Sequence, residues 1–247
     1  MVNIICLKWG TKYNAEHVNR LHRMVKRNLQ TPFIFHCCSE DFVDISPEVH
    51  QIPLPHTDIE SFWWKLWIVS QELPVRGKCI YIDLDTVIQN DIQEMVDFDT
   101  ADNLYILKAQ WRYDKITRLK DKMTATNSSI MCWDNTKYTT SEPYMKFMSD
   151  PEYYMFRYPG NDDFFEKEFP QMVKTLPIHW VYCRAWGYDD TDPNRAEYAP
   201  DDYLDIWNIW LKLYRMPDRM ICMFNGIRDN EGIDSRIYEG FEHYWSD

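Results

Sequence analysis

Two carboxylates stand at the end of an apolar run in the sequence CIYIDLDTV. The run begins at Cys79, and Asp83 and Asp85 are its charged residues. Alternate residues of a strand point to the same side, so the two carboxylates converge if the strand extends that far. Two carboxylates and the oxygens of a diphosphate make a suitable octahedral site for Mg²⁺ or Mn²⁺. On its own, the tripeptide Asp83–Leu84–Asp85 also fits a pair of acids that cap a turn after a strand.

The sequence contains no glycine-rich phosphate loop. Neither GxGxxG after the first apolar run nor GxxxxGK[ST] occurs, and the whole chain has only 7 glycines. If this protein binds a nucleoside diphosphate, another device must therefore neutralise it. The simplest device is a divalent cation held by carboxylates, with Lys or Arg beside it.

The elements before these acids alternate between strand and helix. Apolar runs at 3–9 and 33–38 predict strands, and between them apolar residues recur at helical spacing, at Val18, Leu21, Val25 and Leu29. This pattern predicts an α/β fold with a mostly parallel central sheet flanked by helices. The run at 79–84 is apolar on both alternations until Asp83, which predicts a central strand. Open α/β sheets bind ligands at the carboxyl ends of their strands, where Asp83 and Asp85 would lie.

Later segments give weaker signals of the same kinds. Apolar runs predict three more strands, at 104–109, 128–133 and 220–224. Helical spacing predicts helices over 62–73 and 201–214, whereas three prolines and no periodicity predict a loop over 46–58.

Net charge and cysteine spacing restrict the partners and the compartment. The formal net charge is −12, and an acidic surface repels phosphate backbones, so we expect no nucleic-acid partner. The 7 cysteines include no CxxC pair. The N-terminal apolar run is too short for a signal peptide, and no later run approaches a membrane span. We therefore expect a cytoplasmic protein with buried free thiols and no membrane span.

Five short segments follow one another along the chain: FWWKL from Phe62, CIYIDLDTVIQNDI from Cys79, TNSSIMCWD from Thr126, GNDDFF from Gly160 and FNGIR from Phe224. In this order they resemble the WWxKL, DxD, FNSGVMLW, GDQD and FHGxxK segments of glycosyltransferases with the GT-A fold. The retaining enzymes of glycosyltransferase family 8 are the most similar. The resemblance implies a single GT-A-like (Rossmann-like) domain over 1–247. Residues 1–134 would bind the nucleotide sugar, and the aromatic-rich half at 135–247 would face the acceptor.

The resemblance also assigns roles to individual residues. It implies that Mn²⁺ or Mg²⁺ is held by Asp83, Asp85 and Asn225, and that the nucleotide sugar is bound by Lys65, Asp83, Asn127, Ser128 and Arg228. Lys65 and Arg228 would offset the charge of the diphosphate. Asp162 and Asp163 would be catalytic, because either could orient an acceptor hydroxyl or stabilise an oxocarbenium-like centre. The alternative for these two acids is to cap a helix, which Asp does well.

Two of the five segments depart from the family pattern. Asn161 stands where GDQD has its first carboxylate, and Asp162 stands in the place of the glutamine. Asn225 stands where FHGxxK has a histidine metal ligand. An amide oxygen can bind a hard cation, but imidazole suits Mn²⁺ better. These departures indicate weaker metal binding, metal bound mainly through substrate, or loss of activity.

The resemblance implies a metal-dependent glycosyltransferase that moves a sugar from a nucleotide diphosphate sugar, with a UDP-sugar favoured, to a carbohydrate or other hydroxyl acceptor. Two alternatives stay open. IDLDTV also fits the first motif of haloacid dehalogenase-type phosphatases, with Asp83 as nucleophile and Asp85 as acid/base, although that motif normally opens the fold. A catalytically inactive module that binds sugar nucleotides or glycans would account for Asn161 and Asn225.

Overall fold

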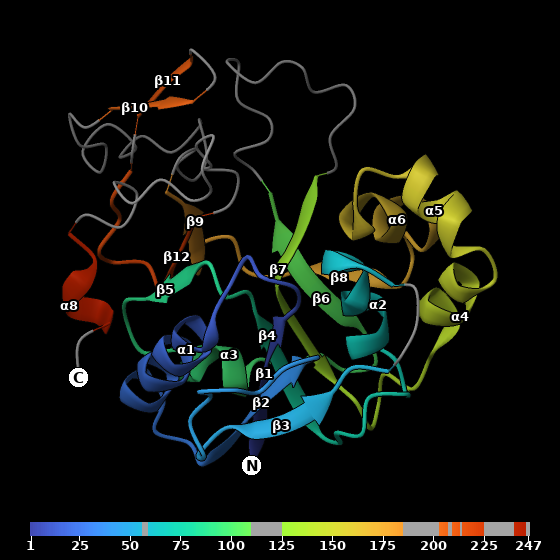
Figure 1. The fold of residues 1–247 in the computed structure, drawn as a ribbon, viewed down its shortest axis with the longest axis horizontal. Coiled ribbons are helices and arrows are strands. Elements are labelled where there is room, and N and C mark those ends of the chain that lie inside the picture. Colours follow the sequence, from blue (N-terminus) through green and yellow to red (C-terminus); the bar gives the residue numbers. More distant parts are fainter. Residues whose placement is uncertain are drawn as a thin grey trace.

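The structure is a computed structural model that describes residues 1–55, 59–109, 125–184, 203–206, 209–212, 214–224 and 240–245 (Figure 1). Its centre is a seven-stranded sheet in the order β3-β2-β1-β4-β7-β6-β8. These strands are β1 (Val2–Lys8), β2 (Phe33–Ser39), β3 (His50–Pro53), β4 (Lys78–Ile82), β6 (Leu104–Lys108), β7 (Thr126–Asp134) and β8 (Val173–Thr175).

The sheet is mostly parallel, which confirms the expectation from the sequence. β1 runs parallel to β2 and β4, β2 runs parallel to β3, and β6 runs parallel to β8. β7 is antiparallel to both of its neighbours, β4 and β6. Because β7 is reversed, its first residues lie at the same edge as the last residues of β1 and β4. This edge therefore collects polar residues from three distant parts of the chain.

Helices cover both faces of the sheet, because successive strand residues point to opposite sides. On one face, Ile4 and Ile80 pack in a core with α1 (Ala15–Asn28) and α3 (Gln93–Asp97). On the other face, Ile5 and Tyr81 pack with three helices, α2 (Trp64–Ile68), α4 (Glu142–Met148) and α6 (Asn161–Glu168). The short helices α5 (Pro151–Arg157) and α8 (Glu242–Trp245) lie beside α4 and α1, respectively (Figure 1). β4 is thus covered on both faces, as its apolar sequence predicts.

A second, three-stranded sheet brings a late part of the chain to the carboxyl edge. β12 (Ile221–Met223) runs antiparallel to β5 (Thr86–Ile88) and parallel to β9 (Val181–Cys183). Met223 is paired with Thr86, and the backbone N–H of Phe224 donates to the Asp85 carbonyl at 2.9 Å. The strand expected over 220–224 is confirmed, and it ends beside the two acids.

The helix expected over 201–214 is wrong. β10 (Tyr203–Ile206) and β11 (Ile209–Lys212) form a two-stranded antiparallel sheet, with Ile206 opposite Ile209. The segment is rich in Tyr, Ile and Trp, which favour strands. Its apolar residues also recur at helical spacing, so the sequence fits both a helix and strands, and the pairing between the two strands decides for strands.

Three smaller expectations also need correction. The loop over 46–58 contains β3, which adds to the edge of β2 and buries Ile52. The helix over 62–73 is shorter than expected, since α2 covers only Trp64–Ile68. A 3-10 turn, η1 (Ser61–Trp63), precedes α2, and just beyond the end of α2 the Ser70 hydroxyl donates to the Trp67 carbonyl at 2.7 Å. β4 ends at Ile82, so Asp83 and Asp85 lie in a turn instead of alternating on a strand.

An aromatic cluster fixes α6 against η1. Trp63 stacks on Phe147 of α4 with ring centroids 4.9 Å apart, and Phe164 of α6 lies edge-on to both rings, at 6.1 and 6.2 Å. Tyr154 and Tyr158 pack edge-on against Phe164. Phe164 is fully buried. The cluster therefore holds the first turn of α6 near the carboxyl edge of the sheet.

All 7 cysteines are buried as thiols, as the sequence led us to expect. Burial raises the pKa of Cys79 and that of Cys132 to about 12, so both thiols stay protonated at neutral pH. Among the described residues, no helix has the length and apolar character needed to cross a membrane.

A matched pair of isoleucines tests the central position of β4. Ile80 of β4 is 0% exposed, whereas Ile34 of β2 is 38% exposed. Ile80→Ala should lower the free energy of unfolding by about 2–5 kcal/mol, because it leaves a cavity in the core. Ile34→Ala should lower it by less than about 1 kcal/mol. Urea unfolding of both variants measures the difference, and equal losses would contradict this placement of β4.

Candidate active site

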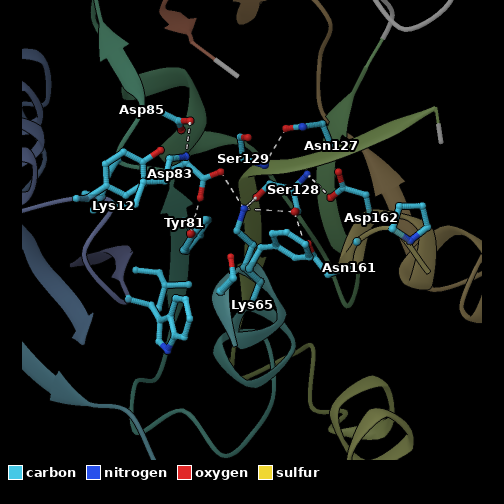
Figure 2. A pocket seen from close by; sticks show the side chains of 18 of the residues that line it. Lys12, Lys65, Tyr81, Asp83, Asp85, Asn127, Ser128, Ser129, Asn161 and Asp162 are labelled. Atoms are coloured by element: carbon cyan, nitrogen blue, oxygen red, sulfur yellow. Dashed lines mark hydrogen bonds and ion pairs between the residues drawn. The ribbon is translucent and has the colours of Figure 1, made fainter. Parts of the chain in front are cut away.

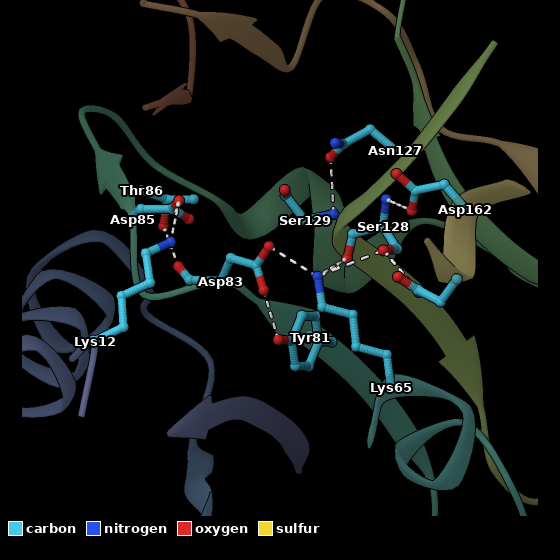
Figure 3. A network of polar contacts seen from close by, with 11 residues as sticks. Lys12, Lys65, Tyr81, Asp83, Asp85, Thr86, Asn127, Ser128, Ser129 and Asp162 are labelled. Carbon is cyan, nitrogen blue, oxygen red and sulfur yellow. Dashed lines mark hydrogen bonds and ion pairs between the residues drawn. The ribbon is translucent and has the colours of Figure 1, made fainter. Parts of the chain in front are cut away.

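Asp83 follows the last residue of β4, and protein donors hold both of its carboxylate oxygens. The Tyr81 hydroxyl donates to Oδ1 at 2.5 Å, and the Lys65 ammonium donates to Oδ2 at 2.8 Å (Figure 3). The backbone N–H of Asp83 donates to the Ser129 carbonyl on β7 at 2.8 Å. Burial and the Asp83 charge raise the pKa of Tyr81 well above its usual range, so its hydroxyl remains a donor. The Asp83 carboxylate is therefore fixed in place at the edge of the sheet.

Lys65 reaches Asp83 from α2 through the protein interior. Its side chain is only 6% exposed. Besides the Asp83 carboxylate, its ammonium contacts the Ser128 carbonyl at 3.2 Å and the Ser128 hydroxyl at 3.4 Å. A buried lysine is tolerated here because a carboxylate neutralises it and oxygen acceptors surround its ammonium.

Ser128 connects this ion pair to the first turn of α6. The Asn161 side-chain amide donates to the Ser128 hydroxyl at 2.9 Å, and the Ser128 backbone N–H donates to Asp162 Oδ1 at 2.8 Å. Gly160 is the residue that caps α6, so Asp162 and Asp163 lie in the first turn and do not form the cap. Carboxylates in a first turn are stabilised by the helix dipole. Asp163 is buried and pairs with Lys167 one turn later, at 3.2 Å.

Asp85 lies on the other side of the turn, next to the loop after β1. Its Oδ2 is 4.0 Å from the Lys12 ammonium. Burial and the nearby Asp83 carboxylate raise the pKa of Asp85, while Lys12 and Lys65 act in the opposite direction. The negative charge of Asp85 is therefore held in an unfavourable environment, which a further cation would improve.

These groups line a single cavity of about 620 Å³ at the carboxyl edge of the sheet. Figure 2 shows Lys12 and Asp85 on one side and Asp162 on the other, with Asp83 and Lys65 between them. Aromatic rings line the cavity as well, from Trp9 and Tyr13 after β1 and from Phe62 in η1.

The acids of this cavity fit a divalent cation that shares its coordination with a ligand. Mg²⁺ in proteins is usually bound by one or two carboxylates together with substrate phosphates. Asp83 and Asp85 supply two carboxylates, and burial together with the Asp83 charge raises the pKa of Asp85. In the described part of the chain, no cluster of three or more His, Cys, Asp or Glu side chains forms a complete metal site. A bound diphosphate would have to supply further oxygens.

Seven of the residues predicted from the sequence meet in this cavity: Lys65, Asp83, Asp85, Asn127, Ser128, Asp162 and Asp163. The Asn127 side chain accepts from the Ser129 N–H at 2.9 Å, which stabilises the start of β7. Asn225 and Arg228 lie outside the described residues, although Phe224 is tied to Asp85.

Sequence reasoning assigned no role to several residues of the site, among them Tyr81 and Lys12. Tyr81 precedes Asp83 by two positions, so a strand places both side chains on one side, and this spacing could have revealed it. Lys12 comes just after the first strand, whose end shares an edge with β4. The parallel pairing that brings these strands together is not visible in the sequence.

No family model matches this sequence, and no curated protein sequence matches it. Its structure is similar to that of the glycosyltransferase GlyE of Streptococcus pneumoniae TIGR4, with a TM-score of 0.67 and 10% identity over 100% of this chain and 62% of that one. It is also similar to the galactosyltransferase LgtC in complex with donor and acceptor sugar analogs, with a TM-score of 0.63 and 14% identity over 98% and 94% of the two chains. The bifunctional glycosyltransferase WbbM gives a TM-score of 0.61 and 13% identity over 100% and 50%.

These similarities show the fold. The chain has the mixed α/β architecture of GT-A glycosyltransferases, with a seven-stranded, mostly parallel central sheet. It spans 62% of the length of GlyE and half of WbbM, but nearly all of LgtC. The GT-A fold expected from the five sequence segments is confirmed.

The ion pair between Lys65 and Asp83 can be tested by a double-mutant cycle. Lys65→Met keeps the length of the side chain but leaves a partly buried carboxylate without its ammonium. The free energy of unfolding at pH 7 should fall by about 1–3 kcal/mol. Asp83→Asn in the Lys65→Met background should recover part of this loss, because a neutral amide needs no counter-charge. If urea unfolding shows that the two single losses simply add, the residues are not coupled.

Proposed function

We propose that this protein transfers a sugar from a nucleotide diphosphate sugar to a hydroxyl acceptor. The observation that carries the proposal is the convergence of Asp83, Asp85 and Lys12 with the acidic first turn of α6 around one cavity. This cavity lies at the carboxyl edge of a GT-A sheet, where α/β folds bind ligands. The similar structures of glycosyltransferases, one of them a galactosyltransferase with donor and acceptor sugar analogs, support the proposal.

The donor would lie between the loop after β1 and the first turn of α6. Trp9 and Tyr13 offer aromatic rings for a base, and Lys12, whose side chain is 40% exposed, offers a cation for the diphosphate. Uridine is the proposed base on the family resemblance. Arg228 would add a second cation, also by resemblance. Lys65, whose ammonium is already bound to Asp83, acts chiefly by positioning that carboxylate.

Mn²⁺ or Mg²⁺ bound at Asp83 and Asp85, with Asn225 proposed as a further ligand by resemblance, would stabilise the negative charge of the departing diphosphate. In the transfer, the bond between the anomeric carbon and the diphosphate oxygen breaks, and its electron pair leaves with the diphosphate. The anomeric carbon then bonds to the acceptor oxygen, whose proton passes to the departing diphosphate. Retention of the anomeric configuration is part of the proposal by resemblance.

Asp162 and Asp163 are the proposed catalytic acids. Both line the cavity next to Asn161, and the bond from the Ser128 N–H fixes the orientation of Asp162. A carboxylate held there could stabilise positive charge that develops at the anomeric carbon, or orient the acceptor hydroxyl. Asn161 departs from the family pattern. It is 2% exposed, and its side-chain amide donates to the Ser128 hydroxyl, so an uncharged residue fits at this position.

The fold weighs against the phosphatase alternative. The motif that would carry a phosphatase nucleophile normally opens the fold, but here three strands of the central sheet and α1 precede β4. The buried thiols suit a reducing compartment, and we propose a cytoplasmic location on that ground.

Metal linkage of donor binding is the first test of this proposal. UDP should bind more tightly with Mn²⁺ than with EDTA, by about tenfold or more. Asp85→Ala should abolish this difference without unfolding the protein, because its side chain does little packing. Asp102→Ala, which removes an exposed aspartate outside the cavity, is the matched control. Isothermal calorimetry that gives one UDP affinity with and without metal would reject the cation site.

The roles of Asp162 and Asp163 can be separated by kinetics. The two variants are Asp162→Asn and Asp163→Asn. The one that removes the catalytic carboxylate should lower kcat by about 100-fold or more and leave donor affinity within about threefold, since the interaction is made mainly in the transition state. UDP release from a UDP-sugar measures turnover, and thermal unfolding shows whether each variant is folded. Wild-type turnover in both variants would leave the two acids as structural residues of α6.

A further inference from the structure

Phe62 exposes a large apolar ring inside the candidate active site. Its residue is 39% exposed, whereas the next two residues, Trp63 and Trp64, are 4% and 2% exposed. Of the large hydrophobic residues that are exposed in the described part of the chain, Phe62 is the one that lines the cavity. Apolar groups in a cavity with a few convergent polar groups are typical of ligand sites.

The backbone around Phe62 holds this ring in a defined place. Ser61 has a φ of 52°, in the left-handed region where a residue other than glycine is strained. Gly160 lies beside the ring, since a Cβ built at that position would be in ordinary van der Waals contact with two of its carbons, at 3.5 Å and 3.8 Å. The Trp63 ring, itself anchored in the aromatic cluster, lies 5.9 Å away between centroids. Strain of this kind persists where the surrounding structure enforces it, and it is concentrated at ligand sites.

The cavity combines this ring with polar groups, and a sugar offers surfaces for both. A pyranose presents C–H groups on its faces and hydroxyls around its rim. The face of an aromatic ring is electronegative and attracts the weakly positive C–H groups. The residues directly after Gly160 are Asn161, Asp162 and Asp163, which line the same cavity and can bond hydroxyls.

We propose that Phe62 is the platform on which the acceptor binds, and that the acceptor is a saccharide with one apolar face against this ring. The inference rests on the transferase function proposed above. The diphosphate of the donor is assigned to Asp83, Asp85 and Lys12, whereas Phe62 lies beside Gly160, on the α6 side of the cavity. An exposed ring on that side is available to a second substrate that enters from solvent.

The test compares Phe62→Leu with wild type and with Phe156→Leu. The leucine keeps an apolar side chain at position 62 but removes the aromatic face. Phe156 is 93% exposed on α5 and does not line the cavity, so it controls for the loss of an exposed phenylalanine. Phe62→Trp should retain the platform. UDP release from UDP-glucose and UDP-galactose is measured with Mn²⁺, alone and with methyl glycosides of glucose, galactose and lactose, or with glycerol, as acceptors.

Phe62→Leu should raise KM for the best methyl glycoside by about three- to tenfold. KM for the donor and UDP release without acceptor should stay within about twofold of wild type. Phe156→Leu and Phe62→Trp should behave like wild type. An unchanged acceptor KM in Phe62→Leu, or equal losses for donor and acceptor, would overturn the proposal, and so would glycerol serving as well as the glycosides.

Direct binding separates this inference from the proposed transferase activity. Saturation-transfer NMR of the same methyl glycosides, with UDP and Mn²⁺ present, should show binding that Phe62→Leu weakens and Phe156→Leu does not. If that pattern appears without turnover of a UDP-sugar, the platform stands and the transferase proposal fails. If wild type binds none of the glycosides, the platform is wrong, whatever happens to the donor.

Discussion

The ion pair between Lys65 and Asp83 joins the parts of the molecule that make up the site. Lys65 comes from α2, Asp83 from the end of β4, and Ser128, which also contacts the ammonium, from the start of β7. Asn161 and Asp162 then attach to Ser128 from α6. An unpaired charge at this depth would be costly, so each partner requires the other in place. The cavity exists because these elements are held together at one edge of the sheet.

Electrostatic balance explains why the site suits an anionic ligand and a cation together. Asp83 is neutralised from within the protein, whereas Asp85 is half-buried, and burial and the Asp83 charge raise its pKa. Lys12 only partly offsets this charge, at 4.0 Å. A bound divalent cation would remove the repulsion between the acids, and a diphosphate would complete its coordination. The sequence has no glycine-rich loop to cradle phosphates, so a cation held by these carboxylates would have to neutralise the diphosphate instead.

The sequence was most informative where one local pattern determined the structure. The apolar run before Asp83 gave the central strand, and the order of five short segments gave the fold. The sequence was misleading at 201–214, because Tyr, Ile and Trp fit either a helix or paired strands, and the pairing between β10 and β11 decides. Lys12 escaped notice because its importance depends on the pairing of β1 with β4, whereas the contact of Tyr81 with Asp83 is local. The contact between Phe62 and Gly160, nearly a hundred positions apart, is likewise set by the packing of α6.

Release of UDP from a UDP-sugar in the presence of Mn²⁺ tests the central claim most directly. The purified protein would be incubated with a panel of UDP-sugars and saccharide acceptors, and free UDP and the glycosylated product would be quantified by mass spectrometry. A metal-dependent sugar transferase should release UDP only with the metal, in an amount matched by product, and should release no phosphate from phosphomonoesters. Phosphate release that Asp83→Asn abolishes, with no UDP freed from any UDP-sugar, would contradict it.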